Sequence, residues 1–342
     1  MRIAVDAAGG DFAPREIVAG AVRAAVDYAD VEKVYLVGPR SSVETALAEQ
    51  RLTLPEKVQL VEASEVIGMG EPPAAAVRRK RNSSVVRTVG LVREGRADAA
   101  FSAGNTGAMV AAATLGLGRL PGVSRPAIAT VIPAPARPFV LIDAGASTDC
   151  EAMWLVEFAV MGAVYAREIL GVENPRVGLV SVGEEEAKGN QATRAAFGLL
   201  ERSGMNFRGN VEAAGMFGGE VDVAVCDGFV GNVILKTAES VADSVAALFR
   251  EAVRGNPVAA LGGFLLRGTY RRMRRRCDPA LYGGAPLLGV KGVCLIGHGA
   301  SRAKAVYNAL RVVCDLEVHR VNQCIVEEVQ KVKSRLGDSA DE

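Results

Sequence analysis

The 342-residue chain lacks the marks of several protein classes. Its 40 Lys and Arg residues nearly balance 39 Asp and Glu, and the resulting net charge of +1 gives no overall field that would favour a nucleic acid as partner. The six cysteines have no CxxC spacing and several lie in apolar runs, so we expect buried free thiols in a reducing compartment. No apolar run reaches about 18 residues and no secretory signal precedes the first expected strand, which predicts a cytoplasmic protein with no membrane span.

Motifs of the common nucleotide-binding loops and of serine hydrolases are also missing. No loop has the Gly-Lys-Ser/Thr of a Walker motif or the GxGxxG fingerprint of dinucleotide binding. The chain shows no Ser-His-Asp signature either. Only two histidines are present, His298 and His319, and the second lies within a helical pattern. The chemistry of this chain must therefore come from loops of another kind.

What the chain does have is a large apolar fraction in a regular alternation of strands and helices. Hydrophobic residues make up 49% of the sequence, enough for a sizeable core. Continuous apolarity in the short strands is typical of parallel strands that are covered on both faces, which predicts an α/β fold. The expected strands are 3–5, 34–37, 58–61, 99–101, 140–142, 177–182, 221–226 and 293–296, with helices at 16–28, 42–52, 74–81 and 85–94.

Five of these apolar runs break into Gly-rich polar loops before a helical stretch resumes. The loops begin at Ser102, Asp143, Gly183, Asp227 and His298. In a parallel sheet such loops all emerge at the carboxyl edge of the strands, where ligands bind. Helix N-termini at that edge supply N–H donors and positive dipole ends. We therefore expect one shared cleft for an anion, with phosphate as the first candidate.

The loop that begins at Ser102 is the first candidate for a phosphate cradle. Its Gly104 and Gly107 let the backbone approach a ligand closely. Asn105 and Thr106 can either donate to phosphate or cap the helix that follows, and the sequence leaves both interpretations open.

Two further loops offer lysines. Lys188 can neutralise phosphate or a developing oxyanion, whereas the preceding 184–186 glutamates are more typical of a solvated helical turn than of a metal site. Asn232 and Lys236 are four residues apart, so they share a helix face and can look into the same cleft. The alternative is an Asp227 helix cap followed by a solvent-exposed lysine.

His298 follows an apolar strand in a Gly-His-Gly turn. Histidine suits proton transfer near neutral pH. A lone histidine in a loop is, however, more often a structural hydrogen-bonding group, so both roles stay open.

A second feature interrupts the alternation between about residues 251 and 285. Apolar residues recur there at helical spacing among arginines. Such a basic amphipathic stretch can lie on an anionic membrane surface, bind an acidic protein, form a dimer arm, or be an ordinary packed helix. The residues expected to contact a membrane or an acidic protein are Leu266, Arg267, Tyr270, Arg271, Met273, Arg274 and Arg275. Residues 334–342 are expected to form a frayed tail.

Six segments, in order across nearly the whole chain, resemble the bacterial phosphate acyltransferase (PlsX) family. They begin at Ile3, Ala63, Ser102, Gly118, Cys226 and Tyr282, and they include Ser102-Ala-Gly-Asn-Thr-Gly-Ala and Cys226-Asp-Gly-Phe-Val-Gly-Asn. The resemblance implies one catalytic domain over residues 1–333. It also implies a three-layer αβα fold with a mostly parallel sheet, like that of phosphate acetyltransferases and of isocitrate and isopropylmalate dehydrogenases. Ala8 and Phe12 depart from the Met and His usual in the family, and we infer that position 12 is structural.

The same resemblance implies the reaction and its partners. A fatty acyl group passes from acyl carrier protein (ACP) to inorganic phosphate, and the acyl phosphate serves phospholipid synthesis. The protein is then a homodimer at the inner face of the cytoplasmic membrane, with the membrane glycerol-3-phosphate acyltransferase as a candidate partner. Phosphate is itself a nucleophile, so the absence of a Ser or Cys nucleophile agrees with this chemistry. No metal or organic cofactor is implied.

These expectations give a set of candidate residues. Lys188, Asn232 and His298 are expected to be catalytic. Contact with phosphate or substrate is expected from Asp6, Gly9, Gly10, Ser102, Gly104, Asn105, Thr106, Gly107, Asp143, Asn190, Asp227, Gly228, Lys236 and Gly299. The rival functions are an acyl-CoA phosphotransacylase, a nicotinamide dehydrogenase of related fold, and a non-catalytic membrane-associated scaffold of lipid synthesis.

Overall fold

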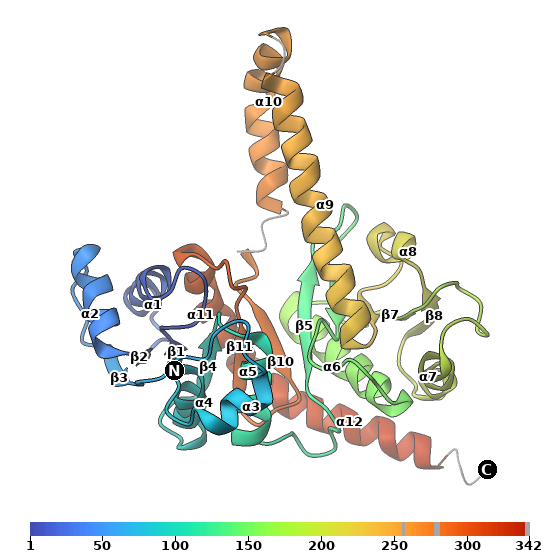
Figure 1. Ribbon diagram of the computed structural model, residues 1–342. Helices are drawn as coiled ribbons and strands as arrows, with labels where there is room; N and C mark the ends of the chain where they lie inside the picture. Colours follow the sequence, from blue (N-terminus) through green and yellow to red (C-terminus); the bar gives the residue numbers. More distant parts are fainter. Residues whose placement is uncertain (255–256, 277–280, 339–342) are drawn as a thin grey trace.

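The computed structural model describes residues 1–254, 257–276 and 281–338, which fold around one large β-sheet (Figure 1). Within these residues the sheet has 11 strands in the order β3-β2-β1-β4-β11-β10-β5-β6-β9-β7-β8. The strands are β1 (Arg2–Asp6), β2 (Lys33–Gly38), β3 (Val58–Glu62), β4 (Ala99–Ser102), β5 (Ala127–Ile132), β6 (Phe139–Ile142), β7 (Val177–Val180), β8 (Phe207–Val211), β9 (Val223–Val225), β10 (Ala285–Leu288) and β11 (Val293–Ile296).

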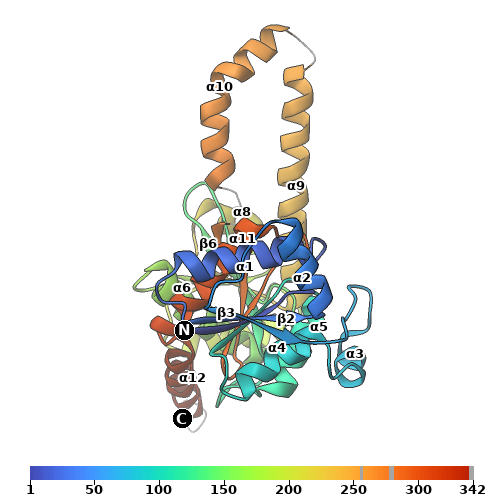
Figure 2. The same ribbon diagram turned by 90° about the vertical axis from the view of Figure 1, so that its left-hand side faces the viewer.

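Helices cover both faces of this sheet. One core cluster packs on α1 (Arg15–Asp27), α2 (Arg40–Glu49), α6 (Ala152–Leu170), α7 (Gln191–Arg202), α11 (Ala303–Val318) and α12 (Val321–Asp338). The clusters of the other face involve α3 (Pro73–Arg79), α4 (Ser84–Arg93), α5 (Thr106–Gly116), α8 (Ala213–Gly218) and the start of α9 (Gly228–Arg254). Figure 2 shows α1 and α4 on opposite sides of β1 to β3. The predicted three-layer α/β fold is confirmed.

The strands alternate their side chains between the two faces, which explains how short apolar runs build both cores. Ala99 and Phe101 of β4 enter the first cluster, while Ala100 between them enters a cluster of the opposite face. All three are fully buried. Strands covered in this way have no polar face, so they read in the sequence as continuous apolar runs.

Three strands were not predicted: β5, β8 and β10. Two of them, β5 and β10, lie at the centre of the sheet and pair antiparallel with their neighbours. Apolarity alone does not encode strand direction, and Pro286 within β10 weakens its strand signal. The mostly parallel sheet is therefore divided by an antiparallel region that the sequence did not reveal.

A long helical arm leaves the sheet where the alternation was expected to fail. α9 and α10 (Pro257–Arg276) stand out from the body as two neighbouring helices (Figure 1). The rings of Phe249 and Tyr270 stack at a centroid distance of 5.2 Å and tie the two helices together. The arm begins well before residue 251, because α9 is one continuous helix from Gly228. No helix in the described part of the chain is long and apolar enough to span a bilayer.

The end of the chain is more ordered than expected. Helix α12 continues to Asp338, so the prediction of a frayed tail from Ser334 is wrong for those residues, and 339–342 lie outside the described part. The physical reason is that α12 has an apolar stripe, including Ile325 and Val329, that is buried in the first core cluster.

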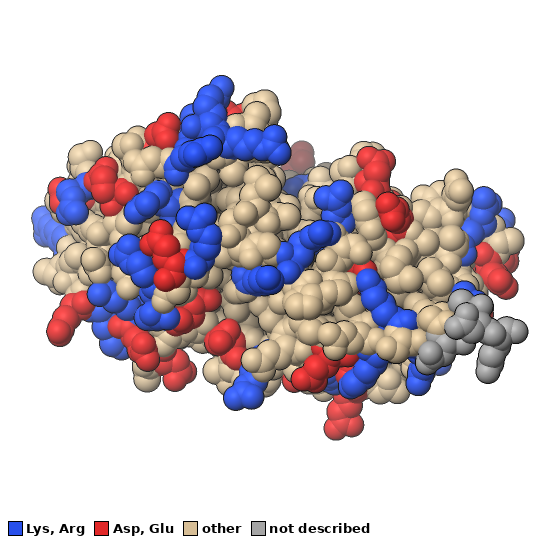
Figure 3. All heavy atoms as spheres, turned by 90° about the horizontal axis from the view of Figure 1, so that it is seen from below, with Lys and Arg blue, Asp and Glu red and all other residues tan. Residues whose placement is uncertain are grey.

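Charged side chains of both signs are interspersed on the face of the molecule drawn in Figure 3. Groups of Lys and Arg alternate there with Asp and Glu and with uncharged surface. That face therefore offers no continuous basic surface of the kind that follows a nucleic-acid backbone.

An ion pair between a buried carboxylate and a partly exposed lysine fixes α12 to the body. Glu157 of α6 is 1% exposed, and its Oε1 lies 2.6 Å from Nζ of Lys333. The backbone N–H and hydroxyl of Ser124 also donate to this carboxylate, at 2.7 and 2.9 Å, and Lys333 donates to the backbone oxygen of Gly122. A buried carboxylate that loses its cation is costly, so this contact should matter for stability.

We predict that Lys333→Ala lowers the free energy of unfolding by about 1 to 3 kcal/mol, because it leaves the Glu157 carboxylate buried without its cation. Urea denaturation followed by circular dichroism measures the change. The matched control is Lys331→Ala, which removes an exposed pair with Glu328 and should cost less than about 0.5 kcal/mol. Equal losses of unfolding free energy in the two variants would contradict a stabilising role of the contact between Lys333 and Glu157.

Candidate active site

The Gly-rich loops form two groups, because the strand direction reverses at the centre of the sheet. β1, β4 and β11 are parallel to one another, and β6, β7 and β9 form a second parallel set. Three successive antiparallel pairings, through β10 and β5, lie between the two sets. The second set therefore runs opposite to the first. The expectation that all five loops emerge at one carboxyl edge is wrong.

The register nevertheless brings the strand ends of the two sets to the same level. Leu295 near the end of β11 pairs with Pro286 of β10, and Ile142 at the end of β6 pairs with Ala129 of β5. Extending the β10–β5 pairing by one residue places Pro286 opposite Ala129. The carboxyl ends of β6 and β11 thus lie on nearly one line across the sheet, and the two groups of loops adjoin.

The first group consists of the loops after β1, β4 and β11, and it is closely packed. A Cβ on Gly9 would lie 2.8 Å from the backbone nitrogen of Gly104, and one on Gly10 would lie 3.2 Å from the backbone oxygen of Gly299. Gly10 also has a φ of +114°, which favours glycine. Glycine is needed at positions 9 and 10 because the loops approach one another too closely to leave room for a side chain.

Two polar residues hold this first group from beneath. Asp6 is 2% exposed, and it accepts a hydrogen bond of 2.7 Å from the hydroxyl of Ser102. That hydroxyl in turn accepts from the backbone N–H of Gly104. Burial raises the pKa of the Asp6 carboxyl, while hydrogen bonds from Ser84 and Ser102 oppose this. The placement of Asp6 and Ser102 favours support of the loop over direct contact with phosphate.

The side chain of Asn105 is also occupied by hydrogen bonds within the protein. Its Oδ1 accepts from the backbone N–H of Ala108 at 3.0 Å and caps α5, while its Nδ2 donates to the backbone oxygens of Gly68, Met69 and Glu71 at 3.1 to 3.2 Å. Of the two roles left open by the sequence, the geometry favours the cap. Thr106 stays exposed at the helix start, and Gly107 packs against Pro73.

The second group of loops is organised by Asp143. This carboxylate is fully buried and accepts from the backbone N–H groups of Ile128, Gly145, Ala146 and Ser147 at 2.7 to 3.1 Å. Burial raises the pKa of its carboxyl, and the four donors act in the opposite direction. With its oxygens occupied in this way, Asp143 shapes the loop and does not face a ligand.

Helix α9 starts against this loop. The carboxylate of Asp227 accepts from the backbone N–H of Val230 at 2.8 Å and caps the helix. A Cβ on Gly228 would lie 2.6 Å from Oδ2 of Asp143, and Gly231 packs still closer against the backbone of Asp143. Only glycines allow the first turn of α9 to lie this near to the buried carboxylate.

The thiols near this group are not nucleophiles. Burial, with the nearby Asp143 and Asp227 charges, raises the pKa of the Cys150 thiol to about 12. The same causes raise the pKa of the Cys226 thiol well above its usual range. Both therefore stay protonated near neutral pH. The five cysteines in the described part of the chain are all free, as predicted, and Cys277 lies outside it.

Helix α9 joins the two groups of loops. Asn232 on its second turn is exposed and lies 3.7 Å from the position of a Cβ on Gly145. One turn later, Nζ of Lys236 lies 2.9 Å from Nε2 of His298, in the loop after β11. Nζ of Lys236 also lies 2.8 Å from Oε2 of Glu239, which is 3.9 Å from the same imidazole nitrogen. Lys236, Glu239 and His298 form one partly exposed polar cluster.

The hydrogen-bond chemistry of this cluster calls for an anion. The backbone N–H of Ala300 donates to Nδ1 of His298 at 3.1 Å, so the proton of the neutral ring lies on Nε2. Nε2–H and the Lys236 ammonium are then both donors, and neither can accept from the other. Two donors aimed at one place require an acceptor there, such as an oxygen of phosphate.

Glu239 was not among the predicted residues. The sequence did hold a signal for it, because Glu239 follows Lys236 at a spacing of three residues on a helix, where side chains are neighbours. What the sequence could not show is that His298, 62 residues after Lys236, reaches the same pair.

No hydrogen bond or ion pair in the described part of the chain joins the loop with Lys188 to this cluster. The Lys188 side chain is exposed and makes no hydrogen bond or ion pair there. Asn190 caps α7 by accepting from the backbone N–H of Thr193 at 2.9 Å. No group of three or more His, Cys, Asp or Glu side chains among the described residues is placed to hold a metal ion.

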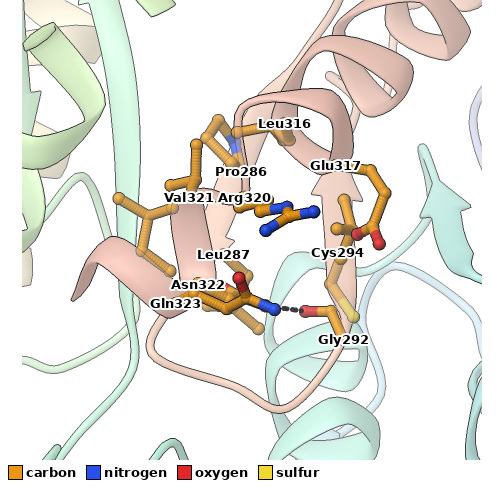
Figure 4. A pocket seen from close by; sticks show the side chains of 12 residues that line it. Pro286, Leu287, Gly292, Cys294, Leu316, Glu317, Arg320, Val321, Asn322 and Gln323 are labelled. Carbon is orange, nitrogen blue, oxygen red and sulfur yellow. Dashed lines mark hydrogen bonds between the residues drawn. The ribbon is translucent and has the colours of Figure 1, made fainter. Parts of the chain in front are cut away.

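A pocket at the other end of β11 is separate from these loops (Figure 4). It lies between β10, β11 and the corner of α11 and α12, and Arg320 is among its lining residues. Asn322 Nδ2 donates to the backbone oxygens of Val290 and Gly292 in its wall. Because β11 begins here and His298 follows its far end, the pocket is not part of the candidate site.

Comparisons with known proteins agree with this architecture. A family model described as fatty acid synthesis protein matches residues 1–324. The phosphate acyltransferase of Pelotomaculum thermopropionicum is 48% identical over 333 residues, covering 97% of this chain and 96% of the relative. That of Leptospira biflexa is 45% identical over 342 residues, covering 99% and 100%. A solved phosphotransacetylase from Streptococcus pyogenes matches with a TM-score of 0.58 at 16% identity, covering 97% and 94%, and shows a shared fold.

We predict that Asn105→Asp speeds hydrogen exchange of the backbone over residues 66–72. The change turns a donor to three carbonyl oxygens into an acceptor, and it should cost about 1 to 3 kcal/mol of stability. Hydrogen exchange read by mass spectrometry measures it. Asn190→Asp is the matched control, because it keeps the α7 cap and the Asn190 Nδ2 makes no hydrogen bond in the described part of the chain. Unchanged exchange at 66–72 in the first variant would show that Asn105 does not hold this segment.

Proposed function

Because the chain belongs to the fatty acid synthesis protein family and has phosphate acyltransferases as relatives, we propose that it transfers an acyl group to inorganic phosphate. The proposed donor is a fatty acyl thioester of ACP. The product is an acyl phosphate for phospholipid synthesis, which a membrane glycerol-3-phosphate acyltransferase would consume. The observation that supports this most strongly is the convergence of Lys236 and His298 on one anion position at the end of β11.

The reaction is a direct displacement. An oxygen of phosphate attacks the thioester carbonyl carbon, a C–O bond forms, the C–S bond breaks, and the thiolate takes a proton to leave as the free carrier thiol. No acyl-enzyme is needed, in agreement with the protonated state of Cys150 and Cys226. The protein must instead hold phosphate against the carbonyl and stabilise the oxyanion that develops, each of which is worth several kcal/mol.

The candidate residues have distinct roles in this proposal. Lys236 and the Nε2–H of His298 bind phosphate, and the departing thiolate takes its proton from the attacking hydrogen phosphate. Asn232 lies one turn before Lys236 on the same face of α9, where its amide can donate to the carbonyl oxygen. Lys188 supplies a further cation from the loop after β7, once substrate draws that loop to the cluster. The buried Asp143 keeps the backbone of the second loop group in place.

The test of function is phosphate-dependent loss of the thioester with purified protein, using ACP and CoA thioesters of the same fatty acid. Loss that requires phosphate and is much faster with the ACP thioester is expected. Faster reaction of the CoA thioester would favour the acyl-CoA phosphotransacylase, and no phosphate-dependent loss with either would leave the scaffold as the better interpretation.

We predict that His298→Asn and Lys236→Ala each lower kcat/KM for phosphate by roughly 10²-fold, the usual loss for one preorganised donor at a reacting oxygen. Lys188→Ala should give a smaller loss, because Lys188 is not held at the cluster before substrate binds. All three side chains are exposed, so circular dichroism should show an intact fold. The control is His319→Asn, which changes the other histidine, at the end of α11, and should keep full activity. A normal rate in one of the three variants removes that residue from the active site.

The helical arm supports a proposal about partners. On α10, Leu261, Phe264 and Leu265 are each more than half exposed, and Arg267 stacks on Phe264 at 4.3 Å. Leu266 and Met273 are exposed too, whereas Tyr270 is stacked on α9. The side chains of Arg274 and Arg275 lie outside the described part. We propose that α10 lies against the anionic inner face of the cytoplasmic membrane, a surface that such a basic and apolar helix suits.

The arm also exposes an apolar stripe on α9. Val241, Val245 and Leu248 recur at helical spacing and are each more than half exposed. Such a stripe is typical of a helix that packs against another helix. We propose that it pairs with a second copy in a homodimer.

We predict that the double variant Arg267→Glu, Arg271→Glu loses most of its binding to vesicles of anionic lipid, because each basic residue near such a surface contributes about 1 kcal/mol. Flotation measures the binding. The control, Arg93→Glu, Arg194→Glu, makes the same charge change on exposed residues of α4 and α7. Light scattering should give a dimer for all three proteins. Equal loss in both variants contradicts the membrane contact, and a monomeric wild type contradicts the dimer.

A further inference from the structure

Glu239 places a negative charge where the proposed reaction needs to bind an anion. Its Oε2 lies 2.8 Å from Nζ of Lys236 and 3.9 Å from Nε2 of His298, the two donors that face one another. Its side chain has no other hydrogen bond or ion pair among the described residues. A carboxylate oxygen and a phosphate oxygen make the same kind of contact with an ammonium and an imidazole N–H.

The donors leave one place for an acceptor, and Glu239 holds it. With Nδ1 accepting from the Ala300 N–H, Nε2 of His298 carries a proton and faces the Lys236 ammonium, and neither group can accept a hydrogen bond from the other. The carboxylate satisfies the ammonium at full hydrogen-bond distance and lies nearer than any other anionic group to the imidazole N–H in the described structure.

We propose that Glu239 is a stand-in for the substrate anion, so that its carboxylate competes with inorganic phosphate for Lys236 and His298. This inference rests on the proposed function and names a residue that sets the affinity for phosphate. In the free protein Glu239 accepts a hydrogen bond from the Lys236 ammonium, while the Nε2–H of His298, 3.9 Å from the same carboxylate oxygen, has no hydrogen-bond acceptor among the described residues. When phosphate binds, one of its oxygens takes the place of Oε2 and the carboxylate turns into solvent.

The carboxylate is free to leave. Glu239 is 33% exposed and Lys236 is 50% exposed, and the two are three residues apart on one helix. Exposed pairs of this kind are weak, because water competes for both partners. Nothing else in the described structure holds Glu239 in place, so a phosphate dianion with a second donor in His298 can displace it.

The test measures phosphate affinity directly and in turnover. Glu239→Gln keeps the length of the side chain and an oxygen for Lys236 but removes the charge, and Glu239→Ala removes both. Each should lower the KM for phosphate by about three- to tenfold, the effect of one like charge near a partly exposed anion, with kcat within about twofold. The Kd for inorganic phosphate from calorimetry, without acyl donor, should fall in parallel. Glu251→Gln removes a charge from an exposed position further along α9 and should change neither constant.

The outcomes separate this inference from the proposed function. If wild type shows no phosphate-dependent thioester loss, the function fails, while the calorimetric comparison still decides whether Glu239 competes with phosphate. An unchanged or raised KM and Kd in Glu239→Gln would overturn the inference, as would the absence of phosphate binding in every variant. A fall in kcat in Glu239→Ala that Glu239→Gln restores would assign Glu239 to positioning Lys236, and this too would overturn it.

Discussion

The antiparallel pair β10 and β5 is the constraint on which the site depends. Without it the strands would all run one way and their loops would lie along a single edge, as in a simple doubly wound sheet. With it, the loops of β1, β4 and β11 and those of β6 and β9 approach from opposite directions at one level of the sheet. A helix that starts in one group can then reach the other, and α9 does so between Gly228 and Lys236.

Buried carboxylates keep the two loop groups in shape. Asp6 fixes the first through Ser102, and Asp143 fixes the second through four backbone N–H groups. Polar groups buried this deeply must be fully hydrogen-bonded. The carboxylates of Asp6 and Asp143 therefore stabilise the loops, and other side chains must contact the substrate. Where the two loop groups meet, the side chains of Asn232, Lys236 and His298 are exposed and can reach a ligand. Such a site suits a reaction in which the substrate itself brings the nucleophile.

The sequence predicted much of this and could not predict the rest. Continuous apolar strands followed by Gly-rich loops gave the α/β class, because a strand buried on both faces has no polar positions. Strand direction leaves no such trace, so the reversal at β10 and β5 was missed. Spacing on one helix correctly related Asn232 to Lys236, whereas the contact of Lys236 with His298 joins residues far apart in the chain. Ligand contacts were predicted for polar loop residues such as Asn105, which instead caps a helix. The sequence cannot separate the two roles, because helix capping and ligand binding use the same kinds of side chain.

The central claim is that an anion binds between Lys236 and His298. The chain has only two histidines, so nitrogen-15 magnetic resonance of labelled imidazoles observes His298 directly, with His319 as an internal reference. We expect Nε2 of His298 to carry a proton, and added inorganic phosphate should shift the nitrogen signals of His298 and leave those of His319 unchanged. A proton on Nδ1, or His298 signals that do not respond to phosphate, would contradict it.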